Sequence, residues 1–288
     1  MSLCSNCPRR CNVDREVSKC ICGVSDTFKI ARAGLHFGEE PCVSGETGSG
    51  TIFFSGCSLK CVFCQNYNIS HEGYGKYVSD ERFIQIVKEL ESSGAENINL
   101  VTPTHYFERL ERVFSLYRPS VPIICNTSGY ECVENIEKDL FDVYLFDLKF
   151  FSPEKSYRYA SCSNYFDYAI NALHKAVELK GKPIIDEKGR IKSGVIIRHL
   201  ILPQNTNESI QIIENLKDIA PYVIFSLMSQ YVPMHKSFEY KELNRRITKR
   251  EYNKVLDKCL ENDFYNIYTQ SFTSATKEMI PDFDLSGV

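Results

Sequence analysis

Short apolar runs alternate with amphipathic segments from residue 51 onward. Each run is bounded by turn residues and is rich in β-branched or aromatic side chains, which is typical of buried strands. We expect six strands, at residues 52–54, 97–101, 121–125, 142–148, 195–201 and 223–227. A last, shorter strand is expected at residues 265–268.

The segments between these strands carry apolar residues three and four positions apart, which predicts helices. Phe83, Val87 and Leu90 share one face of the first helix, and Ser79 or Asp80 can cap its start. Further helices are expected at residues 104–117, 133–140, 153–160, 164–180, 208–219 and 248–260. Residues 183–194 break the rhythm and predict a β-hairpin.

Repeated β–α units imply a parallel sheet with right-handed crossovers. Six of them predict an α/β fold of the partial (β/α)6, TIM-type barrel class. We expect two parts: an irregular, cysteine-rich segment at residues 1–50 and the barrel at residues 51–288. A chain of 288 residues can form such a barrel as one domain.

Composition excludes several classes of protein. The formal net charge is −3, which indicates neither a nucleic-acid-binding nor a membrane-surface protein. The polar N-terminus has no apolar signal region, and no apolar run is long enough to span a membrane. We therefore expect a cytoplasmic protein whose thiols stay reduced.

Nine of the 13 cysteines lie in the first 64 residues, and metal ligation explains this crowding better than chance. Cys57, Cys61 and Cys64 form a C-x3-C-x2-C set in the loop after the first strand. Three thiolates are one short of the four that normally hold an iron–sulfur cluster, so one iron keeps an open position for a substrate or cofactor. A structural zinc fits poorly, because zinc sites usually pair cysteines as C-x2–4-C twice.

This motif closely resembles that of radical S-adenosylmethionine (SAM) enzymes, with Phe63 before the last cysteine and Gln65 and Asn66 after it. Within these enzymes it is most similar to the pyruvate formate-lyase activating enzyme-like group, and the segment 36–50 resembles the same group. The resemblance implies the partial barrel, a 4Fe–4S cluster and SAM chelated to its open iron. It also implies an electron donor such as flavodoxin or ferredoxin, and cleavage of SAM to methionine and a 5′-deoxyadenosyl radical.

The N-terminal cysteines predict a second metal site. Four of them can hold one metal, and the expected ligands are Cys4, Cys7 and Cys11 with either Cys20 or Cys22. Zinc and an auxiliary 4Fe–4S cluster both suit such a set. The alternative of incidental core cysteines is weak, because the segment has too little apolar sequence to bury them.

Polar residues follow the predicted strands, at the end where parallel α/β barrels carry their chemistry. Thr102 and Thr104 stand where the resembled family usually has a Gly-Gly-Glu motif that binds the SAM amino group. Their hydroxyls can accept hydrogen bonds, although they can equally cap the next helix. The candidates from the third strand end, which resembles the family's Thr-Asn-Gly stretch, are Asn126, Thr127 and Ser128. They can hold the SAM carboxylate or ribose, and the alternative is an ordinary Asx turn.

Asp147 and Lys149 resemble an Asp-x-Lys motif of the activating enzymes and are candidate catalytic residues. Their alternation with Leu148 places both on one side of the strand, where the alternative is a plain ion pair. His199, with Arg198 before it, resembles the family's fifth-strand pattern, in which the histidine lies near SAM. A structural histidine is an equally good explanation. Phe63 is a candidate cofactor contact beside the cluster.

The leading hypothesis is therefore a radical SAM oxidoreductase. The resemblance implies a glycine of a partner protein as substrate, as in activation of glycyl radical enzymes. Residues 65–96 contain no cysteine, however, so the ferredoxin-like insert of many activators is missing. A peptide or small metabolite is the alternative substrate, and a non-enzymatic iron–sulfur or zinc protein is the alternative class.

Overall fold

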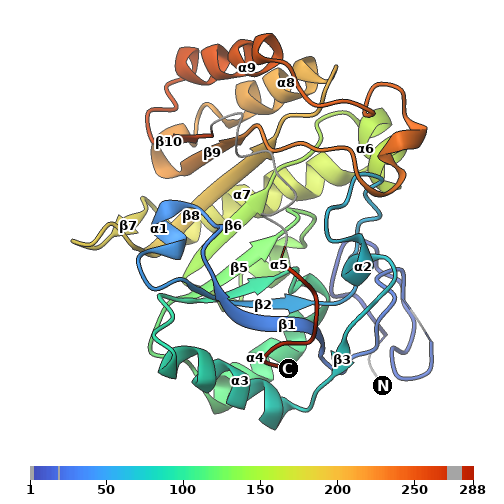
Figure 1. Ribbon diagram of the computed structural model, residues 1–288, viewed down its shortest axis with the longest axis vertical. Coiled ribbons are helices and arrows are strands. Elements are labelled where there is room, and N and C mark those ends of the chain that lie inside the picture. Colours follow the sequence, from blue (N-terminus) through green and yellow to red (C-terminus); the bar gives the residue numbers. More distant parts are fainter. Residues whose placement is uncertain (1–2, 19, 271–280) are drawn as a thin grey trace.

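The computed structural model describes residues 3–18, 20–270 and 281–288 and has one mixed β-sheet at its centre (Figure 1). Its strands are β1 (Lys29–His36), β2 (Ser49–Phe54), β3 (Lys76–Tyr77), β4 (Ile98–Val101), β5 (Ile123–Thr127), β6 (Val143–Asp147), β7 (Ile184–Ile185), β8 (Ile191–Leu200), β9 (Ile224–Met228) and β10 (Ile267–Thr269). The strand order is β10-β9-β8-β6-β5-β4-β2-β1-β3, and β7 pairs with β8 as the predicted hairpin.

The strands from β2 to β10 in this order are parallel, which confirms the predicted α/β fold. Among the described residues β10 and β3 form the two edges, so the sheet is open. The partial (β/α)6 barrel stays a prediction.

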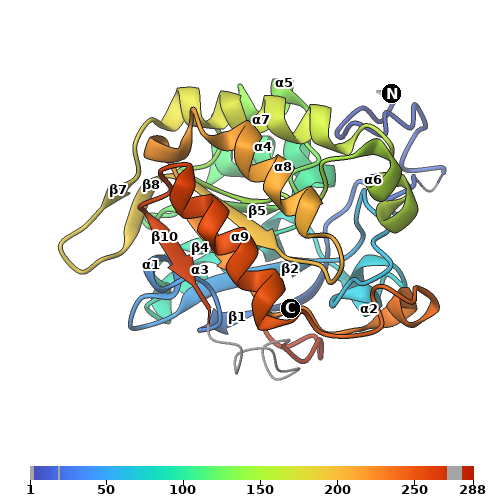
Figure 2. The same cartoon turned by 90° about the horizontal axis from the view of Figure 1, so that it is seen from above.

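Helices connect the strands and include α4, α7 and α8, which lie together on one side of the sheet (Figure 2). Their bounds are α1 (Pro41–Ser44), α2 (Tyr67–Ser70), α3 (Asp80–Ser92), α4 (Phe107–Leu116), α5 (Val133–Ile136), α6 (Pro153–Ala160), α7 (Tyr165–Lys180), α8 (Thr206–Leu216) and α9 (Lys249–Glu261). Short 3-10 turns lie at Thr104–Tyr106, Ala220–Tyr222 and His235–Glu239. The side chain of Ser79 caps α3, and Thr248 and Glu251 form a capping box at α9.

Two expectations from the sequence pattern are wrong. Irregular structure was expected throughout residues 1–50, but β1 lies in this part and pairs antiparallel with β2. Its apolar positions include two alanines, Ala31 and Ala33, so its strand signal is weak. The helix expected to reach residue 140 ends at Ile136, and Asp139 has a left-handed φ of 49° that a helix does not allow. The division of the chain at residue 50 stays a prediction.

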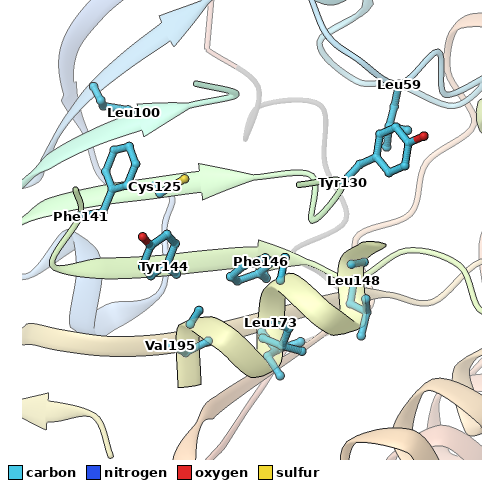
Figure 3. Packing of buried hydrophobic residues seen from close by; sticks show 14 of the residues in the cluster. Leu59, Leu100, Cys125, Tyr130, Phe141, Tyr144, Phe146, Leu148, Leu173 and Val195 are labelled. Atoms are coloured by element: carbon cyan, nitrogen blue, oxygen red, sulfur yellow. The ribbon is translucent and has the colours of Figure 1, made fainter. Parts of the chain in front are cut away.

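The parallel strands other than β10 are mostly buried on both faces, which explains their nearly continuous apolar sequences. Tyr144 and Phe146 of β6 point to the helix side, where they join Leu173 of α7 in the main core (Figure 3). Val143 and Leu145 point to the other face and pack in a smaller apolar cluster. Cys42 and Val43 of α1 belong to this cluster, so α1 packs against this second face of the sheet. We call it the inner face, because it is turned away from α4, α7 and α8. The next inward residue of β6 is Asp147, beyond this apolar cluster.

Candidate active site

A cavity of about 250 Å³ lies where the parallel strands end. Successive strands of the sheet contribute inward-facing residues at this level. They are Phe53, Val101, Asn126, Asp147, Arg198 and Met228. This is the position at which parallel α/β folds place their chemistry, because the loops after the strands converge there.

Most of the predicted site residues line this cavity. They are Cys57, Cys61, Phe63, Cys64, Thr102, Asn126, Thr127, Ser128, Asp147 and Lys149. The buried hydroxyl of Ser128 has no hydrogen-bond partner among the described residues. Such a group is available to a ligand, since a buried polar atom left unsatisfied is costly. The individual roles of these residues stay predictions.

The cysteine loop leaves β2 at Gly56, where φ is +86° and an added Cβ would lie 2.7 Å from the carbonyl oxygen of Cys22. Only glycine fits this close approach without strain. In the loop, the Leu59 N–H donates to Cys57 Sγ at 3.4 Å, and Cys64 Sγ lies 3.2 Å from Ser70 Oγ. Hydrogen bonds to the sulfurs are typical of iron–sulfur sites, so the loop fits a cluster.

Burial raises the pKa of Cys57 to about 11, so its thiol needs a metal to become a thiolate at neutral pH. In the described part of the chain, no three His, Cys, Asp or Glu side chains are placed to hold one metal ion.

Four charged side chains form a network in the cavity wall. Arg198 lies at its centre, with Nε 2.6 Å from Asp147 Oδ1 and Nη1 3.0 Å from Glu39 Oε2. Lys149 Nζ lies 2.9 Å from Asp147 Oδ2. Burial by itself disfavours the charged form of Asp147, but Arg198 and Lys149 outweigh it and lower the pKa of Asp147 to about 2. The predicted ion pair therefore exists, and it also lines the cavity.

Glu39 was not a candidate from the sequence, and Arg198 was named only as the residue before His199. Glu39 Oε1 accepts hydrogen bonds from Asn99 Nδ2 at 2.9 Å and Asn126 Nδ2 at 3.3 Å. Asn126 Oδ1 in turn accepts from Arg198 Nη2 at 2.6 Å. The only signal for Glu39 was a pair of acidic residues in an otherwise glycine-rich loop, with Glu40 as the second.

His199 lies outside the cavity. Because successive strand residues alternate, Arg198 faces inward and His199 faces the helix side. Its Nδ1 lies 2.7 Å from the Leu148 carbonyl oxygen and its Nε2 lies 2.8 Å from Ser209 Oγ in α8. Burial lowers the pKa of His199 to about 4, so it is neutral at pH 7. This environment fits the structural alternative.

Thr104 also lies away from the cavity, so only Thr102 of the two threonines borders it. The hydroxyls of Thr104 and Thr127 both donate to one carboxylate oxygen of Glu131, which is fully buried. Burial raises the pKa of Glu131 to about 7, despite these two hydrogen bonds.

The N-terminal cysteines lie beside the cysteine loop rather than in the cavity (Figure 1). The backbone N–H of Cys57 donates to the Cys22 carbonyl oxygen at 3.3 Å. The guanidinium of Arg9 donates to the Ser58 carbonyl oxygen at 2.9 Å.

The model of the Radical SAM superfamily matches residues 51–216, which is more than half of the chain. The chain belongs to the radical SAM superfamily. Enzymes of this superfamily use a 4Fe–4S cluster and SAM, so the protein is an enzyme of radical chemistry.

Among the described residues, no helix is long and apolar enough to cross a bilayer.

One relative is the uncharacterized protein MJ0674 of Methanocaldococcus jannaschii, which is 32% identical over 269 residues. The match covers 88% of this chain and 73% of the relative.

Solved structures share the fold. SuiB of Streptococcus suis bound to its precursor peptide SuiA has a TM-score of 0.52 and 16% identity, over 76% of this chain and 48% of SuiB. SuiB bound to SAM has a TM-score of 0.52 and 13% identity, over 79% of this chain and 51% of that one. HydG, a maturase of the FeFe-hydrogenase, has a TM-score of 0.52 and 13% identity, over 76% of this chain and 50% of HydG. The chain thus spans about half the length of these structures, and the likeness concerns the fold alone.

Proposed function

We propose that Cys57, Cys61 and Cys64 hold the 4Fe–4S cluster and that the adjoining cavity binds SAM. When bound, this cluster would supply the one electron that cleaves SAM to methionine and a 5′-deoxyadenosyl radical, and the radical would remove a hydrogen atom from the substrate. The observation that carries this proposal is that the three cysteines and the polar strand ends line the same cavity.

The residues of the cavity wall then bind and orient SAM. Lys149 offers an ammonium for the SAM carboxylate, and Asp147 holds that ammonium in place at 2.9 Å. Arg198 is already bound by three side chains and fixes the positions of Asp147 and Asn126. Thr102, with its side chain at the end of β4, offers a hydroxyl acceptor for the SAM amino group.

Phe63 forms an apolar part of the wall. Its ring packs at 6.1 Å, edge to face, against both Phe150 and Tyr231. A rigid aromatic wall keeps water away from the radical and thereby prevents side reactions.

The test is formation of 5′-deoxyadenosine by anaerobically reconstituted protein with SAM and dithionite. Replacing Cys57, Cys61 or Cys64 by alanine should abolish this product, whereas Cys259→Ala, at a buried cysteine outside the cavity, should retain it. A cluster-loaded protein that yields no 5′-deoxyadenosine, while a known radical SAM enzyme does so in parallel, would overturn the proposal.

For the substrate, we propose the Cα of a glycine in a partner protein, on the strength of the resemblance to activating enzymes. Flavodoxin or ferredoxin as electron donor, and a cytoplasmic location, are parts of the same proposal. The test is electron paramagnetic resonance of a pyruvate formate-lyase-type partner after incubation with enzyme, SAM and reductant. A glycine-centred doublet is expected.

A peptide or small metabolite is the second candidate substrate. The fold it shares with peptide-bound SuiB supports the peptide. Production of 5′-deoxyadenosine without any glycyl radical, together with a mass change in a peptide substrate, would favour this candidate over the partner protein.

A further inference from the structure

Backbone hydrogen bonds arrange four of the five cysteines at positions 4–22 as two neighbouring pairs. The N–H of Cys4 donates to the Val13 carbonyl oxygen at 2.9 Å, and the N–H of Asn12 donates to the Cys4 carbonyl oxygen at 3.0 Å. This pairing brings Cys4 beside Cys11. The Gly23 N–H donates to the Cys20 carbonyl oxygen at 2.9 Å, which closes a tight turn around Cys22.

The side chains of these cysteines face one another. Cys4, Cys22 and Cys11 are the groups that interact with the Cys20 thiol. Cys22 interacts in the same way with Cys4 and Cys11. All four are free of disulfide bonds.

Cys7 takes a different position. Its strongest charged neighbour is Glu131 at the end of β5, ahead of Cys22 and Cys4. The side chain is buried, and its backbone carbonyl closes a local turn with the Arg10 N–H at 2.9 Å. Cys7 therefore lies on the side of the segment that faces the end of β5.

We propose that Cys4, Cys11, Cys20 and Cys22 bind a second metal centre, either a zinc ion or a 4Fe–4S cluster. Four cysteine thiolates satisfy both. The set differs from the one expected from spacing, which included Cys7 and only one of Cys20 and Cys22.

Metal binding needs side-chain rotation, because no three ligand side chains among the described residues already surround one point. In the proposed site the four thiols close on the metal by rotation about χ1 between staggered positions.

This centre lies next to the loop that carries the radical SAM cysteines. The Cys22 carbonyl oxygen accepts a hydrogen bond from the Cys57 N–H. The same oxygen lies so close to Gly56 that a side chain at position 56 would clash with it. A metal bound to Cys22 thus fixes one anchor of the Cys57 loop. Since the free energy of metal binding is also folding free energy, the site stabilises the loop as well as its own segment.

The test uses the full chain with Cys57, Cys61 and Cys64 all replaced by alanine, so that only the second site can bind metal. After anaerobic purification and separate loading with zinc or with iron and sulfide, we expect about one zinc ion or about four irons per chain. Whichever metal is retained identifies the centre. The result does not depend on SAM cleavage, so failure here is distinguishable from failure of the proposed function.

Adding Cys4→Ser, Cys11→Ser, Cys20→Ser and Cys22→Ser should lower the bound metal at least tenfold, with Cys7→Ser as the matched control that retains it. Circular dichroism checks folding. X-ray absorption of the protein with Cys57, Cys61 and Cys64 replaced by alanine adds a test that needs no further variant. We expect about four sulfur ligands around the zinc ion or around each iron. Absence of stoichiometric metal, fewer sulfur ligands, or loss of metal in Cys7→Ser would overturn the proposal.

Discussion

Glu131 is a carboxyl group whose ionisation the fold shifts into the physiological pH range. Burial raises its pKa from 4.5 to about 7, although Thr104 and Thr127 donate hydrogen bonds to it. Its other carboxylate oxygen has no partner among the residues that the structure describes. Ionised Glu131 is therefore poorly compensated in the folded protein.

This shift predicts a loss of stability as pH rises. Below about pH 4.5, Glu131 is protonated in both the folded and the unfolded protein. Between pH 4.5 and about 7, Glu131 ionises only in the unfolded protein, so the free energy of unfolding falls as the pH rises. At about 1.4 kcal/mol per pKa unit, the loss is about 3 kcal/mol. Urea unfolding at pH 5 and pH 8 should show this loss in the wild type and a smaller one in Glu131→Gln.

The exposed Glu46→Gln is the matched control and should keep the wild-type pH dependence. An unchanged pH dependence in Glu131→Gln would show that Glu131 is not the group responsible.

At the scale of elements, the described residues before β1 are held by side chains that bind carbonyl oxygens rather than by regular secondary structure. Arg9 is the main example, because one guanidinium donates to the carbonyl oxygens of Ser58, Ala160 and Ser161. It joins the segment to the cysteine loop and to the end of α6. The neighbouring Arg10 makes an exposed ion pair with Glu134 and a side-chain hydrogen bond with Cys132.

We expect Arg9→Ala to lower the free energy of unfolding by about 1–3 kcal/mol, since three hydrogen bonds are lost. The same change should speed the release of cluster iron to a chelator, because the cysteine loop loses an anchor. Thermal unfolding and the rate of iron release measure the two effects.

Arg10→Ala is the control, and it should change stability by less than about 0.5 kcal/mol, as exposed pairs contribute little. Equal behaviour of the two variants would contradict a clamping role for Arg9.

At the scale of the whole molecule, ligand binding in the cavity should stabilise the fold. The cavity wall draws residues from β2 to β9, so a molecule bound there connects most of the sheet. At a SAM concentration about 100-fold above Kd, the stabilisation is about 2.7 kcal/mol. Thermal unfolding of cluster-loaded protein should shift upward by about 5 °C.

The protein with Cys57, Cys61 and Cys64 replaced by alanine should show little shift, because SAM loses the iron that it chelates. Adenosine, which lacks the amino and carboxylate groups, should have little effect on either protein. An equal shift by SAM in both proteins would show that the cluster plays no part in binding.

Much of this architecture follows from local sequence. Alternation of apolar runs and amphipathic segments predicts the parallel strands and most helices. The reason is that burial of one or both faces of an element sets the spacing at which apolar residues recur in the sequence. The spacing of Cys57, Cys61 and Cys64 predicts the cluster loop, since three ligands in one loop need no long-range contact. The polar strand ends follow for the same reason, and most of them line the cavity.

Only the tertiary structure decided which distant residues meet. Glu39 and Arg198 are 159 positions apart, and no local pattern connects them. The sequence named His199 but did not decide which face of the sheet its side chain points to. Successive strand residues point to opposite faces, so a shift of one residue exchanges the cavity for the helix side. The choice among the N-terminal cysteines also depended on backbone turns in an irregular segment. The sequence thus determined most strands and helices and the chemistry of the loop with Cys57, Cys61 and Cys64. Long-range packing decided the charge network and which N-terminal thiols lie near one another.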